Sequence, residues 1–318
     1  MRETLRRMTA YGLYPALLAA ILATVWLSVR NHWDYGAVYG RATLAMVLVL
    51  MAVERIFPLK REWSMTGKSF LRDLRYILLD APTIGLAKAA FGMAALRYGM
   101  HHQGPLAHAP AVPAALAALL AFEFFQYGFH RYSHSAQGPL GRFLWKVHLA
   151  HHLPDRVYVV MHAVFNPINA LLSTAILQGT LILLGVPPAA ALAAALLVDL
   201  QSLISHFNAD IRAGVLNYAF IGTETHRYHH SADVREAGNF GNTLAIWDLV
   251  FGTFRYRPGL APAKLGIGEP DLYPRSEDIL GVLALPFRRR LLPRTGAMAA
   301  GTVPGPERAP REGLAAGA

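Results

Sequence analysis

Residues 130–152 read HRYSHSAQGPLGRFLWKVHLAHH, a stretch that places five histidines within 23 residues. It follows an almost wholly apolar run, AVPAALAALLAFEFFQYGF, at residues 111–129. On a helix, residues three or four positions apart share a face, so the HRYSH and HLAHH motifs each point at least two imidazoles to one place. The stretch therefore predicts a group of imidazoles at the end of an apolar helix, made by His130, His134, His148, His151 and His152.

Two further histidine motifs lie downstream. HRYHH contains His226, His229 and His230, and SHFN places His206 at the end of another apolar run. A lone histidine is usually just hydrogen-bonded, but clustered imidazoles repel one another when protonated and need partners when neutral. A metal cation removes both problems, and imidazole is the commonest metal ligand. The motifs taken together therefore predict metal binding.

The rest of the composition indicates an integral membrane protein. The 318-residue chain is 54% hydrophobic and 16% charged, whereas soluble domains carry about 25% charged residues. A membrane span needs about 20 mainly apolar residues. Six runs qualify, and the last two form a hairpin at Pro187–Pro188 that either spans the membrane or re-enters it. We expect an all-α integral membrane protein with about four full transmembrane helices plus this hairpin, the runs being 11–29, 42–57, 74–96, 111–129, 166–186 and 189–206.

The distribution of Arg and Lys orients this arrangement. Basic residues gather in segments 2–7, 60–75, 131–156 and 212–290, whereas the intervening loops hold few. The positive-inside rule then places the N-terminus and all the histidine motifs in the cytoplasm, as a histidine-rich helical cap. The net charge of +10 suits anionic lipid headgroups rather than nucleic acid. The Ala-, Arg- and Pro-rich composition suggests a bacterial source, hence the inner membrane.

Four regions follow from these patterns. Residues 1–110 are expected to form N-terminal transmembrane helices, and residues 111–258 a catalytic domain that contains every histidine motif. Residues 259–294 are expected to be a cytoplasmic segment with a short helix at 276–285. Residues 295–318 are rich in Gly, Ala and Pro, a composition typical of a disordered tail.

The residue types narrow the choice of metal. The chain has no cysteine, which excludes iron–sulfur clusters and thiolate-bound iron. HRYSH has Arg131 where the HExxH motif of zinc proteases needs its glutamate. Eight to ten histidines suit two metals, and two irons that activate O2 are the favoured choice. The alternatives are a non-catalytic zinc or iron transporter or sensor, and a haem-based electron carrier.

The motifs resemble those of the fatty acid hydroxylase superfamily, which includes sterol desaturases and sphingolipid and fatty acid hydroxylases. The resemblance covers about residues 111–258 and rests on FHRYSH, LWKVHLAHH, SHFN, THRYHHS, NFGN and WDLVFGTF. It implies a non-haem di-iron site with O2 as co-substrate. It also implies hydroxylation or desaturation of a membrane lipid, such as a sterol, fatty acyl, sphingolipid-like or amino lipid.

The resemblance also implies roles for particular residues. The eight histidines of the three motifs and His206 would be metal ligands, and His162 would be a further ligand, although the surrounding MHAVFNP departs from the family pattern. Three more residues would support the ligands. Asn208 follows His206, Glu123 stands where the family often has aspartate, and Asp248 is expected to accept a hydrogen bond from a ligand ring.

The electrons for this reaction must come from another protein, because the sequence contains no flavin, haem or iron–sulfur motif. A ferredoxin, or cytochrome b5 with its reductase, would serve. The basic cytoplasmic segments would attract an acidic donor protein.

Overall fold

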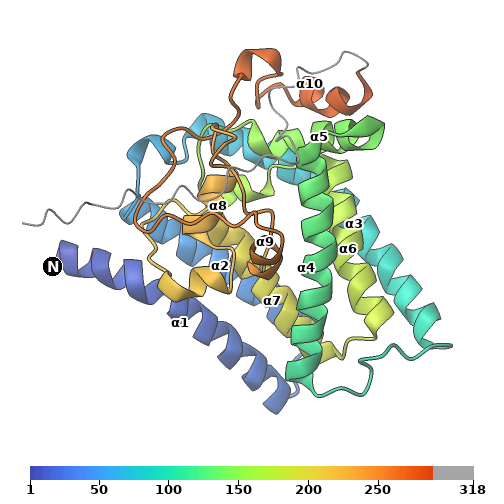
Figure 1. The fold of residues 1–318 in the computed structure, drawn as a ribbon. Helices are drawn as coiled ribbons and strands as arrows, with labels where there is room; N and C mark the ends of the chain where they lie inside the picture. Colours follow the sequence, from blue (N-terminus) through green and yellow to red (C-terminus); the bar gives the residue numbers. More distant parts are fainter. Residues whose placement is uncertain (289–318) are drawn as a thin grey trace, which may run out of the picture.

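The computed structural model describes residues 1–288, and these residues form helices joined by loops (Figure 1). Within this part of the chain the only β-structure consists of isolated bridges, such as Pro58 with Ala209. The all-α fold expected from the sequence is therefore confirmed. The tail expected at 295–318 lies outside the described residues.

Six helices are long and apolar enough to cross a membrane, as the sequence predicted, among the residues that the structure describes. Several extend beyond the apolar runs because polar residues cap them; Asp34, for example, accepts a hydrogen bond of 2.6 Å from the backbone N–H of Ala37. Apolar side chains such as Leu86 and Leu96 point outward, as lipid contact requires. The helices are α1 (Arg2–Arg30), α2 (Tyr35–Ile56), α3 (Gly67–Gly99), α4 (Ala111–Ser135), α6 (Pro167–Leu184) and α7 (Pro188–Ser205).

The two helices of the α6–α7 hairpin pack mainly against other helices rather than against each other. Helix α6 packs mainly on α3 and α4, and α7 mainly on α2, α4 and α1. With 18 residues each, the two helices are about 27 Å long, close to the thickness of a bilayer core. The turn between them is held at Gly185, which has a φ of 63° and lies against Gly104 of the loop between α3 and α4.

Shorter helices lie at one end of the long ones. They include α5 (Gly138–His152), the 3₁₀ segment η2 (Val159–Ala163), α8 (Thr223–His229) and α10 (Ile279–Ala284). The short helix α9 (Ile246–Val250) lies instead against the middle of α4, where Trp247 donates a hydrogen bond to the carbonyl of Leu120. Figure 1 shows α5 and α10 beyond the upper ends of α3 and α4. The predicted helix at 276–285 corresponds to α10 and the short 3₁₀ turn that follows it.

A buried polar network joins this end of α3 to the C-terminal segment. Arg72 pairs with Asp73 at 2.7 Å and donates hydrogen bonds to Tyr158 and Ser276. Tyr158 in turn donates to Asp73. Because a buried charge is costly unless it is paired and hydrogen-bonded, this network fixes the C-terminal segment against α3 and η2.

Candidate metal centre

Nine histidines from four separate parts of the chain gather at this end of the helices. They form two groups, in each of which the ring nitrogens lie within 4.8 Å of one another. We name them cluster A and cluster B. Cluster A contains His130, His134, His148, His152 and His229, and cluster B contains His151, His206, His226 and His230. All nine side chains are buried.

Each of the two HxxHH motifs divides between the clusters by helix geometry. In HLAHH, His148 and His152 belong to cluster A, whereas His151 belongs to cluster B. Residues four apart differ by about 40° around a helix, whereas neighbours such as His151 and His152 differ by about 100°. HRYHH divides the same way, with His226 and His230 in cluster B and His229 in cluster A. The spacing HxxHH thus supplies a pair of ligands to one cluster and a single ligand to the other.

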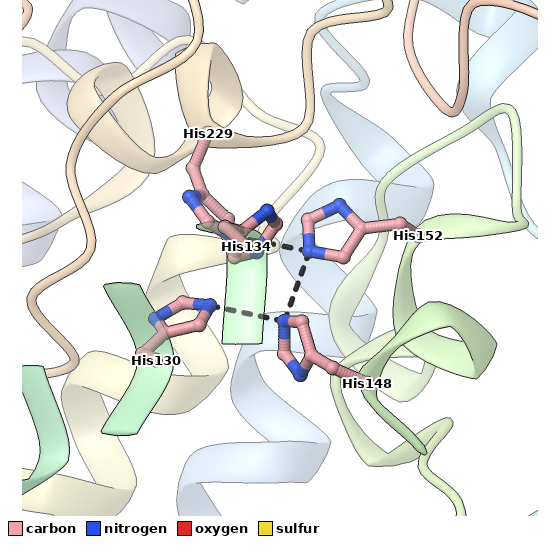
Figure 2. Close-up of side chains that lie close together, drawn as sticks. All are labelled: His130, His134, His148, His152 and His229. Atoms are coloured by element: carbon pink, nitrogen blue, oxygen red, sulfur yellow. Dashed lines mark hydrogen bonds between the residues drawn. The ribbon is translucent and has the colours of Figure 1, made fainter. Parts of the chain in front are cut away.

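Cluster A brings Nε2 atoms to within contact distance of one another (Figure 2). His148 lies 3.0 Å from both His130 and His152, measured between Nε2 atoms. His152 lies 3.2 Å from His229. The Nε2 atom of His134, in the middle of the group, is buried and has no hydrogen-bond partner.

Cluster B repeats this geometry around His206, which follows the last residue of α7. Its Nε2 atom lies 3.0 Å from that of His151 and 3.2 Å from those of His226 and His230. The clusters adjoin, because the rings of His152 and His230 are 4.6 Å apart between centroids.

The opposite ring nitrogens determine the tautomers. His151 and His206 place Nδ1 on the carbonyl oxygens of Val164 and Ser202, at 3.2 and 3.0 Å. A carbonyl only accepts, so each Nδ1 carries the proton and each Nε2 presents a lone pair. The two lone pairs then face each other at 3.0 Å, and a cation between them is the arrangement that satisfies both.

Cluster A follows the same rule. Nδ1 of His130 donates to the carbonyl of Phe240 at 2.8 Å, and Nδ1 of His229 to that of Gly238 at 3.0 Å. Metal-bound histidines almost always place the other ring nitrogen on such an acceptor, which fixes the ring orientation. The acceptor for His148 is the side chain of Asn169, at 3.0 Å. Asn169 was not predicted from the sequence, because an asparagine near the start of an apolar helix is too common a feature to indicate a role.

Burial keeps these rings neutral at physiological pH. It lowers the pKa of His206 to about 3. Burial and neighbouring imidazoles together hold the pKa values of His148, His151, His152, His226, His229 and His230 well below the usual range. A neutral imidazole is the form that binds metal.

The spacing of the nitrogens fits metal coordination. Nitrogen ligands bind at about 2.0–2.1 Å from a metal such as zinc, so adjacent ligands lie about 3.0–3.4 Å apart. The Nε2 separations of 3.0–3.2 Å in both clusters agree with such edges. The unpartnered Nε2 of His134 is available for the same centre. Each cluster therefore has the donors and the spacing to hold one metal ion.

Two buried carboxylates support the clusters through one loop. Asp248 accepts hydrogen bonds from the backbone N–H groups of Phe240 and Gly241, at 2.8 and 2.7 Å, and from the Thr253 hydroxyl at 2.6 Å. Burial raises the pKa of Asp248 to about 6. Glu123 of α4 accepts from the backbone N–H groups of the next residues in the loop, including Thr243 at 3.0 Å. Asp248 therefore does not accept a hydrogen bond from a ligand ring, as its position in the sequence had suggested. It positions the loop whose Phe240 carbonyl accepts from His130.

Asn208 and His162 lie outside the two clusters. Asn208 accepts a hydrogen bond from the backbone N–H of Lys60 and donates one to the Lys60 carbonyl, at 3.2 and 3.0 Å. These bonds join the segment after His206 to the segment after α2. His162 donates to the carbonyl of Val159 at 2.7 Å, and its ring centroid is 6.4 Å from that of His206. His162 therefore lies beside cluster B but is not part of it.

A large cavity opens next to the clusters. Its volume is about 800 Å³, and it lies between α2, α3, α4, α6 and α7. Apolar side chains such as Ile84, Phe122 and Leu177 form much of its lining. His130, His148, His151, His162, His206 and His226 also line it. A long apolar molecule can therefore reach both clusters from within the helix bundle.

Comparison with known proteins agrees with this geometry. The sequence pattern of the fatty acid hydroxylase family matches residues 115–253, the segment that contains every cluster histidine. The chain is also 30% identical over 295 residues to a protein of Rhizobium tropici named ornithine lipid hydroxylase OlsE, and the match covers 87% of this chain and 84% of that protein. No solved structure matches the chain significantly. These similarities support lipid hydroxylation, and they show that the chain belongs to the fatty acid hydroxylase family.

Proposed function

We propose that this protein is a di-iron oxygenase that hydroxylates a membrane lipid with O2. The observation that carries the proposal is the pair of adjoining, buried imidazole clusters that open onto an apolar cavity inside a bundle of membrane-type helices. An all-nitrogen donor set without thiolate suits iron among other metals. The fatty acid hydroxylase family supports iron as the choice.

The nine cluster histidines would hold one iron in each cluster. When bound, the pair of irons supplies the redox chemistry that inserts oxygen from O2 into an unactivated C–H bond. One oxygen atom enters the lipid, and the other leaves as water with two protons and two electrons from an external donor. The backbone carbonyls behind His130, His151, His206 and His229 keep each Nε2 lone pair directed to the centre.

The cavity would position the substrate. Apolar side chains from α3, α4, α6 and α7 line it and exclude water from the bound acyl chains. The relative named as an ornithine lipid hydroxylase makes an amino-acid lipid the first substrate to test here. This choice favours an amino lipid over the sterol, fatty acyl and sphingolipid-like substrates that the sequence motifs also allow.

The clusters would face the cytoplasm, with the protein in the inner membrane of a bacterium. The concentration of Arg and Lys in the segments at this end of the helices supports that orientation. The same residues would attract an acidic electron donor, of the ferredoxin or cytochrome b5 type with its reductase. Arg61, Arg142 and Arg235 are exposed there.

The test is turnover by the purified full-length chain in lipid nanodiscs. Iron content is measured first; then ornithine lipid is incubated with isotope-labelled O2 and a reducing system, and the lipids are analysed by mass spectrometry. We expect about two irons per chain and a lipid product that carries one labelled oxygen. A chain that holds zinc and forms no product under these conditions would support the transporter or sensor reading instead.

A further inference from the structure

Two carboxylates lie in the cavity, inside the membrane-type helices. Asp80 belongs to α3 and Asp199 to α7, and both side chains line the cavity together with the histidines. Asp80 is 4% exposed, and its Oδ1 atom has no hydrogen-bond partner. A buried carboxylate oxygen without a partner is costly, and an ionisable group within a membrane usually marks a functional position.

Asp199 has a defined position relative to cluster B. It precedes His206 by seven residues, which places it on the same helix face, about 10 Å along the axis. Ser202, one turn further along α7, lines the cavity as well. The Thr43 hydroxyl of α2 donates a hydrogen bond of 2.7 Å to Oδ2 of Asp199, which fixes the carboxylate beside the cavity.

The protein itself does not neutralise these two carboxylates. Within residues 1–288, neither Asp80 nor Asp199 forms an ion pair with Lys, Arg or His. Lys88, the one ammonium group in the described lining of the cavity, lies over the ring of Tyr39, 5.5 Å from its centroid. The remaining polar lining consists of neutral groups, such as Gln126 and Ser173, and of the histidines. The cavity therefore combines an apolar wall with two carboxyl groups that form no ion pair within residues 1–288.

We propose that Asp80 and Asp199 bind the cationic amino group of the lipid substrate, and so select amino lipids over neutral or purely anionic ones. An ammonium group has three donors, and its hydrogen bonds to carboxylates are among the strongest in proteins. It supplies a partner for the free Oδ1 of Asp80. A lipid without a cation leaves that oxygen unpaired. This proposal rests on the proposed function, since it assumes that a lipid is the substrate of the histidine clusters.

The experiment measures binding separately from turnover. The wild-type chain and the variants Asp80→Asn and Asp199→Asn are placed in nanodiscs, and lipid binding is measured by native mass spectrometry. The probes are ornithine lipid, the same lipid with its free amine acetylated, phosphatidylethanolamine and phosphatidylglycerol. Asp271→Asn is the matched control, because Asp271 is exposed and is not part of the cavity lining. Asp80→Glu, which keeps the charge, is the conservative variant.

We expect the wild type to bind ornithine lipid at least tenfold more tightly than its acetylated form. Each Asn variant should lose about ten- to hundredfold of its affinity for ornithine lipid, as for one charge-assisted hydrogen bond. Binding of the acetylated lipid should change by less than about twofold, and Asp80→Glu should recover part of the loss. Iron content should remain unchanged, because neither aspartate belongs to the clusters. Comparing the affinity for phosphatidylethanolamine with that for ornithine lipid shows whether the site prefers the amine of a phospholipid or that of an amino-acid lipid.

Equal binding of the free and acetylated amines by the wild type would overturn the proposal. So would an equal loss of both lipids in the Asn variants, which is the result of a purely structural role. The two proposals fail differently. Amine-dependent binding without any product refutes hydroxylation and leaves the aspartate site standing. Equal hydroxylation of both lipids refutes the aspartate site and leaves the hydroxylase standing.

Discussion

His152 and His229 are 77 positions apart in the chain, and their Nε2 atoms lie 3.2 Å from each other. Directly beside them, His151 points instead to His206, at 3.0 Å. Two consecutive residues of α5 thus belong to different clusters, so a substitution at one of them tests one cluster at a time.

Replacing His152 by Ala should remove about one of two bound irons, from cluster A, and replacing His151 should remove the other, from cluster B. Each change should reduce lipid hydroxylation by more than about a hundredfold, because loss of an outer partner alone costs ten- to hundredfold. Iron analysis and lipid mass spectrometry provide the measurement. His101→Ala, in the exposed turn that follows α3, is the control. Full iron content in either variant would contradict the assignment of clusters.

Replacing Asp248 by Asn should weaken iron binding by about ten- to hundredfold without abolishing it. The substitution places an NH2 group against one of the backbone N–H groups of Phe240 and Gly241, so the loop behind His130 shifts. Competition with a chelator of known affinity measures the change. The control is Asp233→Asn, which removes an exposed pairing with Arg235. Unchanged iron affinity would show that the loop position does not matter to the centre.

Acid should destabilise the metal-free protein. An unfolded histidine takes up its proton near pH 6.5, whereas folded His206 does so only at about 3 because of burial. The folded pKa is thus the lower one, so the stability contribution is complete above about pH 6.5 and is lost as the pH falls toward 3. The maximal slope is about 1.4 kcal/mol per pH unit for each such histidine.

The measurement is the melting temperature of the iron-free chain in detergent between pH 8 and pH 5. It should fall as the pH is lowered, and the fall should be shallower in His206→Gln. A melting temperature that stays level or rises on acidification would refute the buried neutral state of the clusters.

Chelation of the metal should lower the melting temperature, because nine lone pairs are then left without a partner. A ligand that binds only the folded state stabilises it by about 2.7 kcal/mol at a hundredfold excess over its Kd. Adding back Fe(II) should restore both melting temperature and hydroxylation, whereas Zn(II) should restore melting temperature alone. Hydroxylation with Zn(II) would argue against redox chemistry at the clusters.

Gly104→Ala should destabilise the fold by about 1–3 kcal/mol, as overpacking does. A Cβ at this position would lie 2.4 Å from the backbone of Leu184 and Gly185, where the loop before α4 meets the α6–α7 turn. Gly92→Ala in α3 is the control, since nothing lies within 4 Å of its Cβ position. Equal melting temperatures for the two variants would show that the loop and the turn do not pack tightly.

The helices and the histidine motifs were predictable because both depend on local periodicity. The six apolar runs each correspond to a helix, and the motifs that were expected to converge do so. Local spacing indicates which histidines of HLAHH share a helix face, but the cluster that each one joins depends on where His206 and His226 arrive in space. The same holds for Asn169, whose contact with His148 is set by the packing of α6 near α5. Asp248 was expected to accept from a ligand ring, but it accepts from backbone N–H groups, contacts that no side-chain motif encodes.

The distribution of the ligands along the chain also bears on the order of biosynthesis. Both clusters draw residues from the first half of the chain and from HRYHH, so cluster A is complete only when His229 has been translated and cluster B only when His230 has. The loop that orients His130 follows at once, at Phe240. By then all six long helices have been synthesised, since α7 ends at Ser205. Metal loading is therefore a late event in maturation, because both centres need histidines that are translated after all six long helices.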